Sequence, residues 1–186
     1  MPAATPAPSA RQTELLERAY RYALQHGLAE LSLRPLAAAI GSSPGVLLFL
    51  VGSKEGLVQS LLQRARADEL AVLRRIREAG AGCGLRVAAV AVWDWLAAAE
   101  HRALLTLWLQ AYSRSLTEPA GPWAGFAADT VRDWLTVLGE LAPGSVESER
   151  TLVLAVLRGG VLDLLATGDV ERVGAAVRGH LAALPS

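Results

Sequence analysis

The sequence has very few side chains suited to disulfide, metal or redox chemistry. Cys83 is its only cysteine and Met1 its only methionine among 186 residues. A single cysteine excludes a disulfide within one chain and a zinc site built from several thiolates. Cys83 lies in the turn-like stretch A-G-C-G, so a redox-sensing thiol stays open as an alternative.

Patterns typical of catalytic sites are also missing. The histidines, His26, His101 and His180, are far apart and form no pair at metal-ligand spacing. The sequence contains no G-x-S-x-G nucleophile motif and no glycine-rich phosphate loop. We therefore expect no metal, no cofactor and no catalytic residues, and we expect that the protein is not an enzyme.

Long hydrophobic runs do not occur. Hydrophobic residues make up 52% of the chain, but apolar stretches such as residues 87–93 are far shorter than the ~18 residues of a membrane span. Residues 1–10 are rich in proline and alanine, without the basic start and apolar run of a secretory signal. We expect a cytoplasmic protein with a disordered tail, no membrane partner, and apolar surface that another subunit covers.

No excess of positive charge marks the chain as a nucleic-acid binder. Its 18 basic and 18 acidic residues cancel, so any electrostatic footprint for a polyanion must be local. One such segment lies between Leu31 and Lys54, which contains no acidic residue while Arg34 and Lys54 are basic. Lys54 is also the only lysine in the chain.

Helical periodicity runs along nearly the whole chain. Apolar residues recur at helical spacing, glycine and proline separate the segments, and no stretch alternates as a strand would. The pattern predicts an all-α protein of about nine helices. The expected ranges are approximately 11–26, 33–40, 44–50, 53–79, 85–100, 102–117, 122–141, 146–167 and 169–184.

Two of the predicted helices are short and flank a tight turn. Ser32 can cap the first, Gly41 ends it, and Pro44 opens the second. Two helices joined by a turn of three or four residues that contains glycine form the helix-turn-helix pattern, whose second helix enters the major groove of DNA.

Residues 11–62 resemble the N-terminal domain of TetR-type bacterial transcription regulators. The shared pattern is a small-residue helix, a glycine, a serine or threonine cap, a turn of the form found here as L-A-A-A-I-G, and a terminal S-K-E-x-L. The resemblance implies a DNA-binding regulator, commonly a repressor, with a second helical domain that senses a ligand and forms a dimer. The scarcity of lysine would suit a GC-rich, actinobacterium-like genome. The positions in register are Ala19, Gly27, Ser32, Leu36, Ala37, Gly41, Ser43, Gly45, Leu47, Ser53, Lys54, Glu55 and Leu57.

The expected domains are a disordered tail at 1–10, a helix-turn-helix domain at 11–56, and an effector-binding and dimerisation domain at 57–186. Ser32 and Lys54 lie at helix starts on either side of the recognition helix, where a hydroxyl and an ammonium can hold phosphates. The expected partner is double-stranded DNA with a near-palindromic operator, because a dimer places two recognition helices roughly 34 Å apart. The predicted DNA-binding residues are Ser32, Arg34, Ser43, Pro44, Gly45, Val46, Leu48, Phe49 and Lys54.

The predicted recognition helix, V-L-L-F-L-V, contains no side-chain hydrogen-bond donor. The family pattern implies polar aromatic residues at the positions of Leu48 and Leu50, where they would bind phosphates. Two hypotheses follow. The apolar side chains contact thymine methyl groups, or they form a patch for another contact in a module that has weakened or lost DNA recognition.

All five tryptophans lie in the second predicted domain. Aromatic side chains on neighbouring helices can line an apolar pocket, and the resemblance implies an effector site for an unknown apolar small molecule here. Packing in a plain core is the alternative. Trp93 and Trp95 face nearly opposite sides of a helix, so they cannot both line one pocket. The predicted pocket residues are Trp93, His101, Trp108, Tyr112, Phe126 and Trp134.

The last two predicted helices are apolar on more than one face, which a single small core cannot absorb. If they meet their symmetry mates, they form a four-helix bundle, as the resemblance also implies. A buried hairpin within one chain is the alternative. The predicted homodimer residues are Leu152, Val156, Gly160, Leu164, Val173, Val177 and Leu181.

Three functions therefore stay open. The S-K-E-G-L segment and the acid-free stretch favour a ligand-responsive repressor. The missing donors in the recognition helix favour a TetR-like dimeric module that binds small molecules or proteins. A helical enzyme or carrier that uses the cavity is a more distant third.

Overall fold

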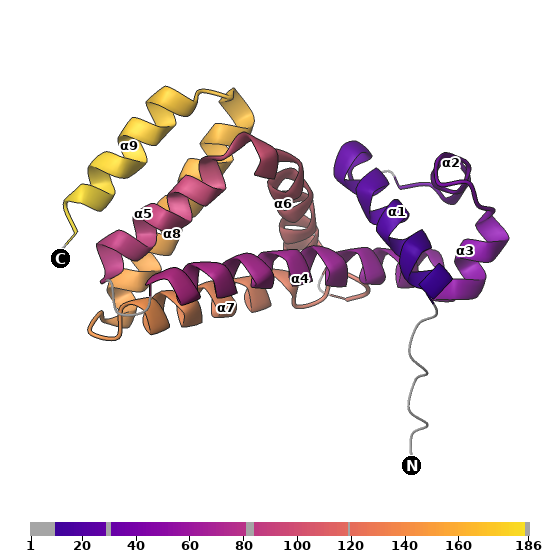
Figure 1. The fold of residues 1–186 in the computed structure, drawn as a ribbon, viewed down its shortest axis with the longest axis horizontal. Helices are drawn as coiled ribbons and strands as arrows, with labels where there is room; N and C mark the ends of the chain where they lie inside the picture. The colour runs from indigo at the N-terminus through magenta and orange to yellow at the C-terminus, as the bar shows by residue number, and fades with distance from the viewer. Residues whose placement is uncertain (1–9, 29–30, 81–83, 119, 185–186) are drawn as a thin grey trace, which may run out of the picture.

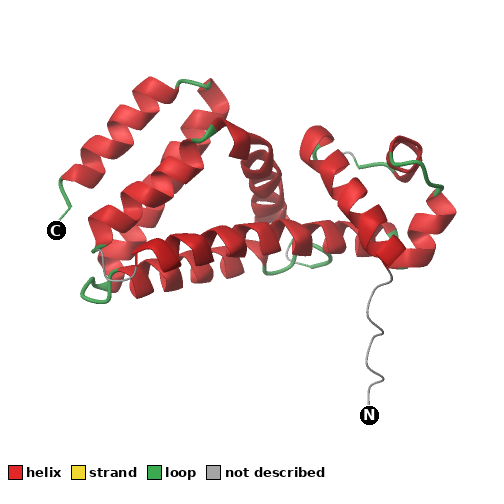
Figure 2. Ribbon diagram, in the orientation of Figure 1, coloured by secondary structure: helices red, strands yellow, loops and turns green. Residues whose placement is uncertain are grey.

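The computed structural model describes residues 10–28, 31–80, 84–118 and 120–184. Within these ranges the chain forms nine α-helices, one short 3-10 helix and no strand (Figure 2). This confirms the predicted all-α fold. Most of the expected tail at 1–10, namely residues 1–9, lies outside the described residues, and so does Cys83.

The helices follow the predicted ranges with two differences. The fifth ends earlier than expected, at Ala97, because Ala98 adopts an extended conformation. The seventh begins at Phe126, because Gly121 and Gly125 precede it with φ of +85° and +75°. The elements are α1 (Ala10–His26), α2 (Leu33–Ala39), α3 (Pro44–Val51), α4 (Lys54–Gly80), α5 (Leu85–Ala97), η1 (Ala99–His101), α6 (Arg102–Thr117), α7 (Phe126–Leu141), α8 (Glu147–Thr167) and α9 (Val170–Ala182).

The helix α4 organises the molecule. Helices α1, α2 and α3 gather around its beginning, while α5, α7, α8 and α9 lie along and beyond its second half (Figure 1). Two hydrophobic clusters form, one at each end. Leu57 and Leu61 of α4 belong to the first, together with α1, α2, α3 and part of α6. Leu73 belongs to the second.

Polar contacts fasten α1 to α4 beside the first cluster. The Arg64 guanidinium of α4 forms an ion pair with Glu17 of α1 at 2.5 Å and a second ion pair with Asp68. The buried Tyr20 hydroxyl donates a hydrogen bond of 2.9 Å to Asp68. Burial and the neighbouring Asp68 raise the pKa of Tyr20, so this hydroxyl keeps its proton. These contacts hold α1 against α4.

A separate contact joins the N-terminal helices to α6. The backbone N–H of Leu28 donates to the side-chain oxygen of Gln110 at 2.8 Å. Gly27 precedes it with φ +79°, and a Cβ there would lie 2.8 Å from the Gln110 amide nitrogen. Because glycine alone tolerates both the backbone conformation and the close approach, it is the residue that fits this turn.

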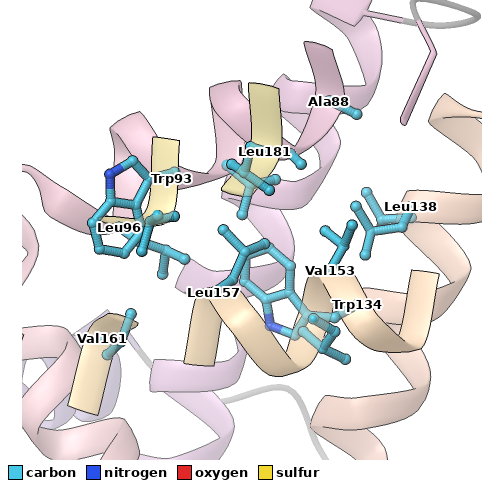
Figure 3. Close-up of a cluster of buried hydrophobic side chains, with 14 of the residues drawn as sticks. Ala88, Trp93, Leu96, Trp134, Leu138, Val153, Leu157, Val161 and Leu181 are labelled. Atoms are coloured by element: carbon cyan, nitrogen blue, oxygen red, sulfur yellow. The ribbon is translucent and has the colours of Figure 1, made fainter. Parts of the chain in front are cut away.

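Helices α5, α8 and α9 pack closely through the second cluster (Figure 3). The side chain of Trp93 on α5 is 1% exposed and lies against Gly160 of α8. A Cβ on Gly160 would be 2.8 Å from Trp93 Cζ3 and 2.7 Å from Val177 Cγ2. The missing side chain is therefore what lets α8 approach α5 and α9.

Among the described residues, no single helix has both the length and the apolar composition needed to cross a membrane. Only α2 and α3 pass that test of length and composition, as a pair with a 103° bend between them.

We expect Gly160→Ala to destabilise the fold by about 1–3 kcal/mol, because the added methyl group overpacks a filled core. Adding Trp93→Phe removes the two ring atoms that the methyl group meets, so the double variant should be less destabilised than the sum of the two single variants. Urea unfolding followed by circular dichroism measures all three. Strict additivity would contradict this packing.

Candidate functional site

The helices α2 and α3 form a helix-turn-helix unit at one end of the molecule (Figure 1). The chain bends by 103° between them, within the range of this motif. Gly41 makes the turn with φ +69°, and the N–H of Ser42 donates to the Ala37 carbonyl at 2.8 Å. Arg18 of α1, which the sequence analysis did not single out, donates to the carbonyl of Ile40 at 3.3 Å and so braces the turn.

One side of α3 packs inward and the other is exposed. Leu47 is fully buried, whereas Val46, Leu48 and Phe49 are 38%, 36% and 88% exposed. The Ser43 hydroxyl accepts a hydrogen bond from the Val46 N–H at 3.2 Å, so this serine caps the helix. The outer face of α3 is therefore apolar, and Phe49 is its most exposed side chain.

Basic and hydroxyl groups flank this apolar face. Arg34 on α2 and Lys54 at the first position of α4 are both exposed. Ser32 precedes α2, and its side chain makes no capping hydrogen bond, unlike the hydroxyl of Ser53, which caps α4 by accepting from Gly56 N–H at 2.9 Å. The predicted DNA-binding residues thus lie on α2 and α3, at the caps that precede these two helices, and at the start of α4. All are exposed except the half-buried Pro44.

A cavity lies between α4, α5, α6, α7 and α8. Its volume is about 40 Å³. It is therefore narrow, and a guest must be slender or must push the walls apart. The lining residues are Ala65, Glu69, Val92, Trp95, Leu96, Leu104, Leu105, Trp108, Phe126, Trp134, Leu154, Leu157, Arg158 and Val161.

The structure brings three of the six predicted pocket residues, Trp108, Phe126 and Trp134, into this lining. Trp95 lines the cavity, while Trp93 packs on the other side of α5. His101 stacks on Trp95, with ring centroids 4.1 Å apart, behind the wall. Tyr112 lies next to Trp108, with centroids 5.0 Å apart. Phe126 also borders a surface groove beside α4.

Glu69 is a buried acid in the cavity wall. Its side chain accepts a hydrogen bond from the Trp134 indole N–H and pairs with Arg66 at 2.5 Å. Burial raises the pKa of Glu69, and Arg66 and the Trp134 N–H oppose that rise. The Arg66 guanidinium also pairs with Asp133, so it is held between two carboxylates.

Arg158 is the basic group in the wall, and the sequence analysis missed it. Its Nη1 lies 3.5 Å from the Tyr112 hydroxyl, and its guanidinium lies 5.2 Å from the centre of that ring. Burial lowers the pKa of Arg158. A signal for it existed, because Arg158 is the only charge in the apolar run from Thr151 to Leu162.

Most of the predicted dimer residues lie inside the chain's own core. Only Leu152 is exposed and Val156 is half-buried, whereas Gly160, Leu164, Val173, Val177 and Leu181 are buried. The exposed stripe on α8 is different. It consists of Leu152, Ala155, Gly159, Leu162 and Ala166, which recur every three or four residues and so share one face.

No group of three or more histidine, cysteine, aspartate or glutamate side chains suited to a metal ion occurs among the described residues. The features that the fold does present are an apolar exposed helix, a narrow cavity with buried charges, and an apolar helix face.

No family model and no curated protein matches the sequence. Solved structures do match the fold over nearly its whole length. A Rhodococcus protein described as a TetR-family transcriptional regulator has 17% identity and a TM-score of 0.72, covering 94% of this chain and 98% of that one. A TetR transcription regulator from Haloarcula marismortui has 16% identity and a TM-score of 0.70, covering 92% and 94%. The multidrug binding protein EbrR, complexed with proflavin, has 22% identity and a TM-score of 0.64, covering 92% and 99%. At these identities the similarity establishes a shared fold.

We expect Glu69→Gln to change the dependence of stability on pH. Because the pKa of Glu69 is raised by folding, its contribution to stability is greatest below the unfolded value of about 4.3 and declines as pH rises through the folded value. The free energy of unfolding of the variant, relative to the parent, should therefore increase from pH 4 to pH 7. Urea titrations at several pH values measure it, and a constant difference would refute the expected shift.

Proposed function

We propose that the chain is a homodimeric, DNA-binding transcription regulator of the TetR type, whose affinity for DNA is set by a small apolar molecule in the cavity. The α2–α3 unit carries this proposal, because an exposed second helix at the tip of a helix-turn-helix is the geometry that enters a major groove. Its occurrence within a fold shared with TetR-family regulators supports the same function.

In this proposal some residues around α3 bind the phosphates and others contact the bases. Lys54, Arg34 and the free hydroxyl of Ser32 hold phosphates and fix the register of the protein on the duplex. The exposed side chains of Val46, Leu48 and Phe49 face the bases, where an apolar group can contact a thymine methyl. Repression relieved by an effector is the mode of action that we propose.

Two connections can carry the effect of a ligand from the cavity to α3. Ala65 and Glu69 line the cavity from α4, the helix that begins with Lys54. Trp108 lines it from α6, two residues before Gln110, which holds the backbone of Leu28. A ligand can shift DNA affinity only by as much as it prefers one arrangement of these helices over another.

The first test is selection of random duplex DNA by the purified protein, and we expect enrichment of a near-palindromic site. Lys54→Ala should weaken binding to all sequences alike and lower the slope of log affinity against log salt by about 1, because one phosphate contact is lost. Phe49→Ala should weaken binding and reduce the sequence preference of the selected DNA. It should change the slope of log affinity against log salt very little. Fluorescence anisotropy measures both.

Arg75→Ala is the matched control for the loss of a positive charge. Arg75 is exposed on the same helix, about 30 Å beyond Lys54 at 1.5 Å per residue. It should leave affinity and salt slope nearly unchanged. If selection enriches no sequence and residual binding is weak and uniform, specific DNA recognition is refuted.

That outcome would support the second candidate, a dimeric binding module of the same fold without specific DNA recognition. The apolar outer face of α3 is the observation that favours it, since no side-chain donor is present between Val46 and Val51 to bond a base edge. In that case α3 is a docking surface for another molecule.

The dimer is proposed to form through the exposed stripe of α8, next to the C-terminal helix α9. Leu152 and Leu162 are 51% and 47% exposed, and the exposed Ala155, Gly159 and Ala166 lie on the same helix face and allow a second helix to approach closely. Two α8–α9 pairs would then form a four-helix bundle around a twofold axis.

We expect Leu162→Glu to convert the dimer to a monomer, because two carboxylates would be buried near the twofold axis without partners. Leu116→Glu, at a position on α6 that is 67% exposed, should leave the dimer intact. Light scattering coupled to size-exclusion chromatography gives the mass. A monomeric parent protein, or a dimeric Leu162→Glu variant, would argue against this interface.

A further inference from the structure

Two hydrogen-bond donors in the cavity wall have no acceptor among the described residues. One is Nη2 of Arg158 on α8, and the other is the indole Nε1 of Trp108 on α6. Both atoms are buried, and both residues line the cavity. A buried donor without an acceptor is costly. Among the described residues four more such atoms occur, on Trp93, Arg102, Thr130 and Arg150, but Trp108 and Arg158 alone among them line this cavity.

The charges around the cavity indicate the sign of that acceptor. Glu69 is the carboxylate among the lining residues, and its two oxygens already accept from Arg66 and Trp134. Arg158 makes no ion pair within 4.0 Å with any described carboxylate, and its contacts are with the rings of Trp108 and Tyr112. The guanidinium is thus partly buried among aromatic rings; it interacts electrostatically with Glu69 but forms no ion pair with it, and Glu69 is already paired with Arg66.

We propose that the cavity binds an apolar organic acid, with its carboxylate held by Arg158 Nη2 and Trp108 Nε1 and its hydrocarbon part between the apolar walls. The planar guanidinium presents donors in the geometry that a carboxylate accepts. This inference rests on the proposed role of the cavity as the effector site and names the chemical class of the effector.

The shape of the cavity restricts the hydrocarbon part. Because the free space is narrow, a slender chain enters with less rearrangement than a fused ring system does. Trp95, Leu104 and Val161 supply apolar contacts along the walls. A cationic ligand is disfavoured, because its positive charge would lie near the positive charge of Arg158. Glu69 cannot serve as its partner, because this carboxylate already pairs with Arg66.

Titration calorimetry of the full chain with octanoate, octanol and octylamine tests the proposal without DNA. These probes share one hydrocarbon tail and differ in the head group. We expect octanoate to bind at least about 10-fold more tightly than octanol, since a charge-assisted hydrogen bond is gained. Octylamine should bind most weakly. Equal or tighter binding of octanol or octylamine, or no binding of octanoate, would overturn the proposal.

Substitutions locate the head group. Arg158→Gln should weaken octanoate about 10- to 100-fold and leave octanol within about threefold, because only the charged head uses the guanidinium. Trp108→Phe keeps a ring but removes the N–H, and it should weaken octanoate by about 3- to 10-fold. If Arg158→Gln keeps the preference for octanoate, the assignment is wrong.

Arg150→Gln is the matched control. Arg150 is a half-buried arginine on the same helix, outside the cavity lining, and it donates to the Ser145 carbonyl at 3.0 Å. It should bind octanoate like the parent. Circular dichroism checks that each variant is folded. If Arg158→Gln does not fold, the binding of octanoate to Trp108→Phe still decides the test. Because the readout is direct binding, its failure refutes the ligand class alone, whereas failed DNA selection refutes the proposed recognition of DNA.

Discussion

The structure depends on α4 being one uninterrupted helix that belongs to two hydrophobic clusters. Its 27 residues span roughly 40 Å at 1.5 Å per residue, and residues 57–79 contain neither glycine nor proline. Leu57 is packed with the N-terminal helices and Leu73 with the C-terminal ones. The two clusters are therefore coupled by a stiff element, and Arg64 fastens α1 to that element through Glu17.

The cavity lies where this stiff helix meets α5, α6, α7 and α8. Its walls combine large aromatic rings with two partly or fully buried charges. These two charges differ in the partners that they have inside the protein. Glu69 has its ion pair and its hydrogen bond inside the protein, whereas Arg158 has a long contact with the Tyr112 hydroxyl and lies over the rings of Tyr112 and Trp108. A buried donor without an acceptor is costly, and two of the residues that line this cavity, Arg158 and Trp108, carry one.

The sequence predicted the fold well because its signals are local. Glycine and proline mark the helix ends, and Gly41 and Pro44 place the turn between α2 and α3 to within one residue. The exposed residues of α3 were also predictable. The inward face of α8 was not, because that helix is apolar on more than one face and periodicity cannot rank those faces. For the same reason the choice between Trp93 and Trp95 as the cavity residue needed tertiary structure. Arg158 had a local signal, an isolated charge in an apolar run, whereas Glu69 on the charged helix α4 had none.

The exposed phenylalanine on α3 has a thermodynamic consequence for any partner. Phe49 is 88% exposed, and its neighbours Val46 and Leu48 present apolar surface as well. Whatever surface covers them removes hydrocarbon from water, which makes the heat capacity change of association negative. Because burial of apolar surface near room temperature is driven by entropy, this contact weakens on cooling. Temperature is therefore expected to affect the α3 contact more than ionic strength does, the reverse of a recognition helix rich in arginine and lysine.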